Sequence, residues 1–224
     1  IYSGTGNDVL KTGSGIVEAG AGDDHITSGG GTVDAGVGND VIVSTGGVVD
    51  GGTGTDELVA DLRVHTAYNY RRSLVYWRQD GAGNQVNMVG SGSSWADVDA
   101  YLAVGGTNYL GSQYVYSPEG YALLSYSNIE KVSLTGLEVD PYYGVFGDDL
   151  LIVVGQGGKY VGGGGTDTLY VDWSATSSSI VWQNTSIESN VNGTIISGIE
   201  RLLLQTGSGN DLIDNSANNT NDDI

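Results

Sequence analysis

Four aspartates recur at a fixed interval near the N-terminus. Asp8, Asp24, Asp40 and Asp56 are each 16 residues apart, and each follows glycines four and two residues earlier. Glycine has no Cβ and can adopt positive φ values, which turn successive carbonyl oxygens to one side of a loop. Carbonyl oxygens and a carboxylate form a hard-oxygen ligand set that suits Ca²⁺ better than zinc or copper. The spacing therefore predicts a row of calcium sites.

The aspartates belong to a 16-residue unit that begins at residues 3, 19, 35 and 51. A short fixed period is typical of a solenoid, in which each unit is one coil stacked on the next. Aliphatic residues at equivalent places predict two ladders that face each other across a thin core, with strands about 4.8 Å apart. These ladders are Leu10, Ile26, Ile42 and Leu58, and Val17, Val33 and Val49.

The first nine residues of each unit resemble the G-G-x-G-x-D-x-U-x repeat of the RTX family of secreted bacterial proteins. The match covers residues 3–11, 19–27, 35–43, 51–59, 144–152, 162–170 and 206–214. The resemblance implies an all-β fold, a right-handed parallel β-roll or β-helix of 16–18-residue coils with lateral insertions and one short helix. It also implies several Ca²⁺ ions, each held between two turns. The second and fourth carbonyls of one turn, the first and third of the next, and both aspartates would be the ligands. The implied ligands are Gly4, Gly6, Asp8, Ala19, Gly20, Ala21, Gly22, Asp24, Ala35, Gly36, Val37, Gly38, Asp40, Gly51, Gly52, Thr53, Gly54, Asp56, Gly147, Asp149, Gly162, Gly163, Gly164, Gly165, Asp167, Thr206, Ser208 and Asp211.

The second half of each unit departs from the family pattern. It has seven residues rather than nine and carries glycine, serine and threonine without an aspartate at its turn. We therefore expect metal along one edge only in residues 1–60. Asp24 and Asp40 should each serve two ions, one above and one below, whereas Glu18, Asp34 and Asp50 should serve none.

Composition limits the partners of the chain. Its 224 residues include 8 Lys and Arg against 27 Asp and Glu, a formal charge of −19. Nucleic acid and anionic membrane surfaces would be repelled. There is no cysteine for a disulfide framework, and no stretch is apolar enough to span a bilayer. Metal can replace disulfides as the stabilising element of a secreted domain. The first residue is Ile and another turn begins near the last, which we read as an excerpt from a longer protein.

The repeat is interrupted twice, and the second interruption follows the plan of the first. We expect a solenoid over 1–62, a lateral β-rich insertion with one helix over 63–127, solenoid over 128–173, a short lateral hairpin over 174–196 and a truncated continuation over 197–224. Ser94 is the expected N-cap of a helix over 94–103. Glu130 and Glu200 occupy equivalent places where each interruption ends, and we expect them to accept backbone N–H bonds. Because the second copy does without the helix-containing segment, that segment should be removable.

The favoured function is calcium-driven folding and a structural or adhesin role in a large extracellular bacterial protein. The RTX resemblance implies type I secretion, and we expect no catalysis in this segment. One alternative is a calcium-dependent binding module in which the insertion over 63–127 recognises a carbohydrate or surface ligand, chiefly through its arginine- and aromatic-rich residues 63–80. Another is the C-terminal module of an extracellular enzyme. Ice binding would need an outward row of Thr and Asn, but the third positions are Thr5, Ala21, Val37 and Thr53, which breaks the row.

Overall fold

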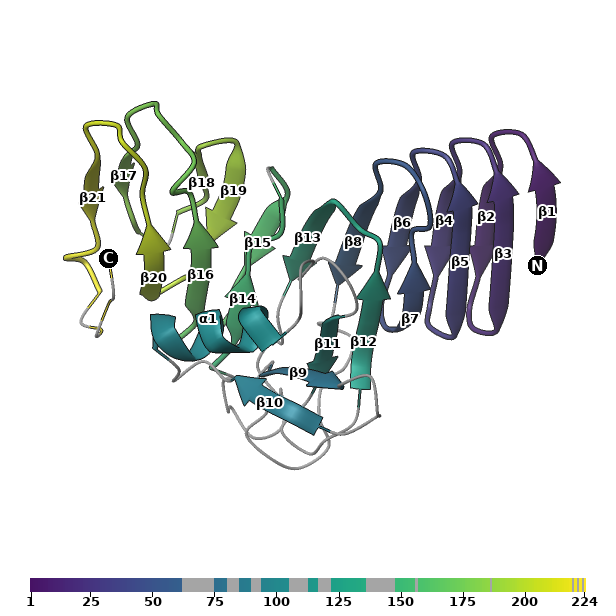
Figure 1. Cartoon of the computed structure of the whole chain (residues 1–224), viewed down its shortest axis with the longest axis horizontal. Coiled ribbons are helices and arrows are strands. Elements are labelled where there is room, and N and C mark those ends of the chain that lie inside the picture. The colour runs from purple at the N-terminus through teal and green to yellow at the C-terminus, as the bar shows by residue number, and fades with distance from the viewer. Residues whose placement is uncertain are drawn as a thin grey trace.

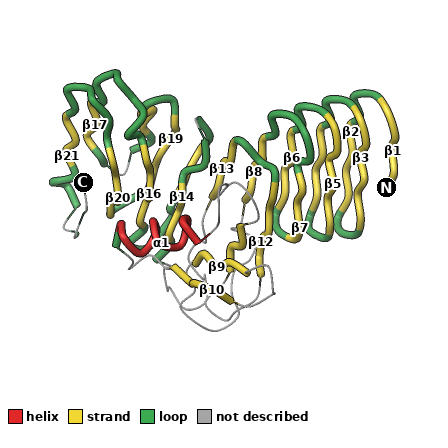
Figure 2. Tube along the Cα trace, in the orientation of Figure 1, coloured by secondary structure: helices red, strands yellow, loops and turns green. Residues whose placement is uncertain are grey.

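The chain is mostly β with parallel sheets, as the sequence predicts (Figures 1 and 2). The structure is a computed structural model that describes residues 1–61, 75–79, 85–89, 94–104, 113–116, 122–135, 148–155, 157–185, 187–218, 220, 222 and 224. Glycine-rich residues 144–147, including the expected ligand Gly147, lie outside the described residues. So does most of the arginine- and aromatic-rich segment over 63–80.

In the N-terminal part the chain alternates between two sheets, and each 16-residue unit contributes one strand to each. Neighbouring strands within a sheet are parallel, with residues 16 apart in register. The first sheet contains β1 (Tyr2–Thr5), β3 (Ile16–Ala21), β5 (Thr32–Val37), β7 (Gly47–Asp50) and then β12 (Ala122–Ser127). The second contains β2 (Val9–Thr12), β4 (His25–Ser28), β6 (Val41–Ser44), β8 (Glu57–Asp61) and then β13 (Lys131–Thr135).

Both predicted aliphatic ladders are confirmed. Ile26, Ile42 and Leu58 are in register in the second sheet and fully buried, with Leu10 partly buried at the first coil. Val17, Val33 and Val49 are in register and buried in the first sheet. Burying aliphatic side chains on both inner faces gives each coil a thin apolar core, and fully burying one such side chain stabilises by roughly 1.5–3 kcal/mol.

The C-terminal part adds two further sheets. Strands β14 (Leu150–Ile152), β16 (Thr168–Asp172) and β20 (Arg201–Gln205) form a third, parallel sheet. The second sheet continues through β15 (Lys159–Val161) and β19 (Thr194–Ser197), with β18 (Ser189–Val191) antiparallel at its edge. A fourth sheet pairs β17 (Val181–Gln183) with β21 (Leu212–Asp214) in parallel. Only β18 and β19 form the hairpin expected over 174–196, because β17 is a parallel strand.

The insertion extends the first sheet with antiparallel strands. These are β11 (Gln113–Tyr116), β9 (Val75–Gln79) and β10 (Gln85–Val89). Strand β12, the last element of the expected insertion, bonds to β11 on one side and to β7 on the other, so it joins the insertion to the first sheet. The helix α1 (Trp95–Val104) begins as predicted, because Ser94 Oγ accepts the Asp97 N–H at 3.3 Å and donates to Asp97 Oδ2 at 2.8 Å.

Helix α1 packs against the third sheet, whose strands come much later in the sequence (Figure 1). The Trp95 ring stacks on Tyr170 of β16 with centroids 4.4 Å apart, and the Tyr170 hydroxyl donates to Asp99 Oδ1 at 2.8 Å. Tyr170 is in register with Ile152 and Leu203, and all three are buried. The insertion therefore covers an apolar face of the third sheet, which argues against the expectation that it is removable.

Candidate metal sites along the turn edge

The aspartates of the four repeats form one column, in which the carboxylates of Asp24, Asp40 and Asp56 each bond to the coil before. Asp24 Oδ1 accepts the N–H of Asp8 at 2.8 Å, Asp40 Oδ1 that of Asp24 at 2.7 Å, and Asp56 Oδ1 that of Asp40 at 2.8 Å. Asp24, Asp40 and Asp56 are at most 2% exposed. We call Asp8, Asp24, Asp40 and Asp56 the aspartate column.

The second carboxylate oxygen of each column member is buried and has no hydrogen-bond partner. The same is true of Asp167 in the C-terminal part. Leaving a buried acceptor unsatisfied costs about 1–3 kcal/mol, and more when it is charged. These oxygens therefore require either a proton or a cation.

Burial makes the charged form of these aspartates unfavourable. Loss of hydration raises the pKa of Asp40, and it raises the pKa of Asp56 to about 6 and that of Asp167 to about 8. Neighbouring carboxylates add to each rise, Asp40 acting on Asp56 and Asp149 acting on Asp167. A cation between the coils would reverse both effects, because it would compensate the lost hydration and the mutual repulsion.

Glycines bring the turns of successive coils into close contact. Gly20 and Gly22 have φ values of 109° and 131°, which side chains disfavour. A Cβ on Gly20 would lie 2.0 Å from the carbonyl oxygen of Gly4, and one on Gly22 would lie 2.4 Å from that of Gly6. Backbone carbonyl oxygens of one turn thus lie against the backbone of the next, and a side chain at either glycine would collide with them.

The donor set fits a hard divalent cation. Within the described residues, no three His, Cys, Asp or Glu side chains are grouped so that they could hold a metal. A site between two turns would therefore combine two carboxylates with backbone carbonyls. The carbonyls of Ala21, Val37 and Thr53 each accept one N–H from the preceding turn, at 2.7, 2.8 and 2.9 Å. A carbonyl oxygen has a second lone pair, so this bond does not prevent coordination.

A second ladder, which the sequence reasoning missed, runs beside the aspartate column in the opposite direction. Asn7 Oδ1 accepts the N–H of Asp23 at 2.9 Å, Asp23 Oδ1 that of Asn39 at 2.8 Å, and Asn39 Oδ1 that of Thr55 at 3.0 Å. The signal was present, because the fifth position of every matched unit is polar. Its residues are Asn7, Asp23, Asn39, Thr55, Asp148, Thr166 and Asn210.

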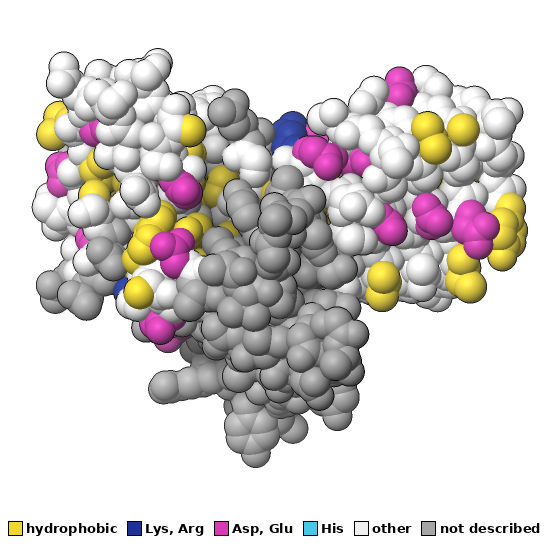
Figure 3. All heavy atoms as spheres, in the orientation of Figure 1, with side chains coloured by type: hydrophobic (Ala, Val, Ile, Leu, Met, Phe, Trp, Pro, Cys, Tyr) yellow, Lys and Arg dark blue, Asp and Glu magenta, His cyan; other side chains and the backbone are white. Residues whose placement is uncertain are grey.

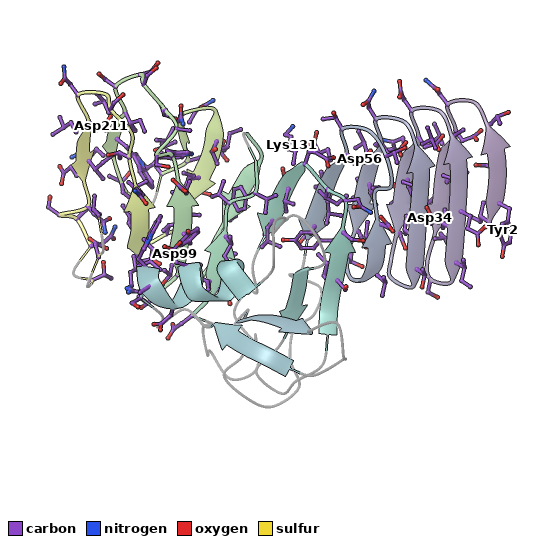
Figure 4. All side chains as sticks on the ribbon, in the orientation of Figure 1. Tyr2, Asp34, Asp56, Asp99, Lys131 and Asp211 are labelled. Atoms are coloured by element: carbon purple, nitrogen blue, oxygen red, sulfur yellow. The ribbon has the colours of Figure 1, made fainter. Side chains whose placement is uncertain are left out.

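The seven-residue turns at the opposite edge are organised by hydroxyl groups. Ser28 Oγ donates to Gly30 O at 2.6 Å and accepts the Gly30 N–H at 3.1 Å, and Ser44 does the same with Gly46. Asp34, on the outer face of β5, is exposed. Figure 4 shows Asp34 on the sheet face and Asp56 at the turn edge. The buried, unpartnered carboxylate oxygens of the repeats therefore belong to the aspartate edge alone.

The C-terminal part repeats the arrangement over a longer coil. Asp167 Oδ1 accepts the N–H of Asp149 at 2.8 Å, across 18 residues. Gly163 and Gly165 have φ values of 100° and 137°, as the second and fourth positions of the earlier turns do. Asp211 belongs neither to the aspartate column nor to the pair of Asp149 and Asp167, because its Oδ1 accepts the N–H of Ile180 at 2.8 Å.

Glu130 and Glu200 accept backbone N–H bonds, as predicted. Glu130 Oε2 accepts from Asp56 and Glu200 Oε2 from Asp167, both at 2.8 Å. The return bonds also match, because Asp56 O accepts the N–H groups of residues 130 and 131, and Asp167 O those of residues 200 and 201. This agreement supports the internal duplication read from the sequence.

No protein-family model and no curated protein matches the chain. The part of the chain that the structure describes has no helix with the length and apolar character needed to cross a bilayer.

Proposed function

We propose that the aspartate edge binds Ca²⁺ between successive turns and that this binding drives the chain to fold as a β-roll of the RTX type. The observation that carries the proposal is the buried carboxylate oxygen without a partner, repeated at Asp8, Asp24, Asp40, Asp56 and Asp167. A single orphan oxygen is a local defect. Five in equivalent positions indicate a common missing positive charge.

Four pairs of turns hold two aspartates each. They are the pairs carrying Asp8 and Asp24, Asp24 and Asp40, Asp40 and Asp56, and Asp149 and Asp167. In each pair, both carboxylates and the adjoining glycine-turn carbonyls would hold one ion. Ca²⁺ accepts six to eight oxygen ligands in flexible geometry, which suits a site made mostly of backbone.

The charge of the chain links binding to folding. Glu18, Asp34 and Asp50 lie in register on neighbouring strands, and acidic side chains spread over the N-terminal stack in Figure 3. Like charges at this spacing oppose the compact state until cations neutralise the chain. Because the sites exist only when coils are stacked, the free energy of binding becomes free energy of folding.

The proposed setting is extracellular. Dissociation constants of about 10⁻⁴–10⁻³ M are typical of extracellular calcium modules and would leave the chain unfolded in a calcium-poor cytosol. We propose a non-catalytic, structural or adhesive segment of a larger secreted bacterial protein, exported before it folds.

Circular dichroism of the 224-residue chain tests the proposal. In EDTA at pH 7.5 the spectrum should be that of a largely disordered chain, and millimolar CaCl₂ should make it β-rich. MgCl₂ at the same concentration is the control, because Mg²⁺ demands near-octahedral geometry and retains its waters. Identical spectra in EDTA and in calcium would refute the proposal.

A further inference from the structure

Strand β20 is the last strand of the third sheet, and one of its edges faces away from β16. Arg201 N–H donates to Asp167 O at 2.9 Å, and Gln205 O accepts the Trp173 N–H at 2.8 Å, so the odd-numbered residues of β20 bond toward β16. Consecutive residues of a strand direct their backbone groups to opposite sides. Residues 202 and 204 therefore face the other edge, where no further strand follows among the described residues. An edge of this kind is a template for pairing with another strand.

Side chains of residues 215–222 bond to that edge. Asp222 Oδ1 accepts the Leu202 N–H at 3.0 Å. The Thr220 hydroxyl donates to Glu200 O at 2.7 Å, and Asn215 Nδ2 donates to the same carbonyl at 2.9 Å. A backbone donor and a backbone acceptor at the start of β20 are thus both satisfied by side chains.

Backbone groups of the next coil fill the equivalent place in earlier coils. Asp56 O accepts the N–H groups of residues 130 and 131, and Asp167 O accepts those of residues 200 and 201. Glu200, like Asp167, ends the turn that precedes a strand of the third sheet. At Glu200 O, two side-chain donors replace those N–H groups. Residues 215–222 therefore take the place of a further coil at this edge.

Buried amides fix this segment to the coil before it. Asn184 and Asn215 directly follow the paired strands β17 and β21 and are 2% and 7% exposed. Asn184 Nδ2 donates to Asn215 Oδ1 at 2.8 Å, and Asn215 Nδ2 donates to Asp222 Oδ2 at 2.8 Å. Figure 1 shows the C-terminus beside β20. The Asp222 carboxylate is thus held in place from the interior of the stack.

We propose that residues 215–222 are a cap that closes the outer edge of β20 against pairing with a second copy of the chain. The edge is self-complementary. Antiparallel pairing centred on Leu203 would place Leu202 of one copy opposite Leu204 of the other, and both residues direct their N–H and C=O groups toward that edge. Covering an edge with a loop that carries a charge is a common protection against such pairing. Residues 215–222 then end the third sheet rather than begin another coil.

Hydrogen exchange by NMR and light scattering of the full chain in millimolar CaCl₂ test the inference. The double variant Thr220→Val and Asp222→Ala removes one donor and the acceptor. In dilute solution its Leu202 amide should exchange about tenfold or more faster than in the wild type, because a hydrogen bond to a charged acceptor is lost. In concentrated solution the variant should form a dimer in which this amide is protected again, whereas the wild type should stay monomeric.

Two matched variants are the controls. Asp222→Asn keeps an oxygen for the Leu202 N–H and should retain most of its protection. Asp34→Ala removes an exposed charge away from this edge and should match the wild type in both measurements.

Three results would overturn the inference. Equal exchange of the Leu202 amide in the double variant and the wild type would mean that Asp222 closes nothing. A double variant that stays monomeric at high concentration would mean that the uncovered edge does not pair with a second copy. Faster exchange throughout β4 and β6 would mean that residues 215–222 support the whole fold rather than one edge.

Discussion

Asp40→Asn separates the hydrogen-bonding role of the aspartate column from its charge. The amide oxygen of Asn can still accept the Asp24 N–H that Asp40 Oδ1 accepts at 2.7 Å. The substitution removes a buried negative charge whose cost is visible in the raised pKa of Asp40. In EDTA, the variant should therefore be at least as stable as the wild type. In calcium, it should be much less stable, because two proposed sites lose a charged ligand.

The size of the calcium effect follows from the position of Asp40 between two turns. A ligand that binds only the folded state stabilises it by about 2.7 kcal/mol when its concentration is 100 times Kd. Loss of the two sites that share Asp40 would then remove about 5 kcal/mol of calcium-dependent stability. Asp8→Asn should remove about half as much, because Asp8 has a neighbouring turn on one side only. Asp34→Asn should remove none.

Urea unfolding followed by circular dichroism, in EDTA and in 10 mM CaCl₂ at one shared pH near 6, measures these differences. Calorimetric titration of the same variants gives the number of sites lost. The reasoning is refuted if Asp34→Asn loses as much calcium-dependent stability as Asp40→Asn. That result would mean that the seven-residue edge also holds metal. It is equally refuted if Asp40→Asn is destabilised to the same degree with and without calcium.

Three further predictions concern the turns, the pH and the insertion. Gly38→Ala should destabilise the stack by at least about 1–3 kcal/mol, because its φ is 151° and the new Cβ would lie 2.1 Å from a backbone oxygen. Gly13→Ala is the control, because its Cβ enters open space, and it should be near neutral when both variants are unfolded by heat. In EDTA, circular dichroism should show more β-structure at pH 5 than at pH 8. Burial raises the pKa values of Asp56 and Asp167 from 3.8 to about 6 and about 8, so the folded state retains protons that the unfolded state loses, and the reverse order would contradict this. Trp95→Ala should lower the free energy of unfolding by about 1–3 kcal/mol, because the ring contact with Tyr170 is lost, and the denaturation midpoint should fall with it. An unchanged midpoint would show that the helix does not stabilise the third sheet.

The N-terminal stack was predictable because each coil contacts only its neighbours. A period of 16 residues then fixes which residues pair, and the aliphatic alternation fixes which side of each strand faces inward. Leu58 pairs with Ile42 for this reason. The hydroxyl-organised turns at Ser28 and Ser44 could be recognised only as turns, because their bonds depend on backbone geometry that the sequence does not state.

The C-terminal part was less predictable because its contacts are not periodic. The contact between Asp99 and Tyr170 joins residues 71 apart, and no repeat relates them. One clue to this contact was present in the sequence, because β16 has Tyr170 at the position where β8 has Val59.

The two glutamate turns show what limits the length of an aspartate column. Only residues 128–130 lie between β12 and β13, whereas residues 51–56 lie between β7 and β8. The shorter turn has no room for a glycine loop, yet the longer side chain of Glu130 still reaches the N–H that the next aspartate would bind. Each glutamate turn, at residues 128–130 and 198–200, also lies against the first glycine of the repeat turn that it follows in the stack. A Cβ on Gly51 would be 2.1 Å from Asn128 O, and one on Gly162 would be 1.9 Å from Gly198 O. The first position is glycine in both of these turns, at Gly51 and Gly162, whereas the first three turns of the aspartate column have Ser3, Ala19 and Ala35 there. The glutamate of each such turn thus satisfies the last N–H of a column without a further glycine turn, and its place in the sequence would set the number of the proposed metal sites in that column.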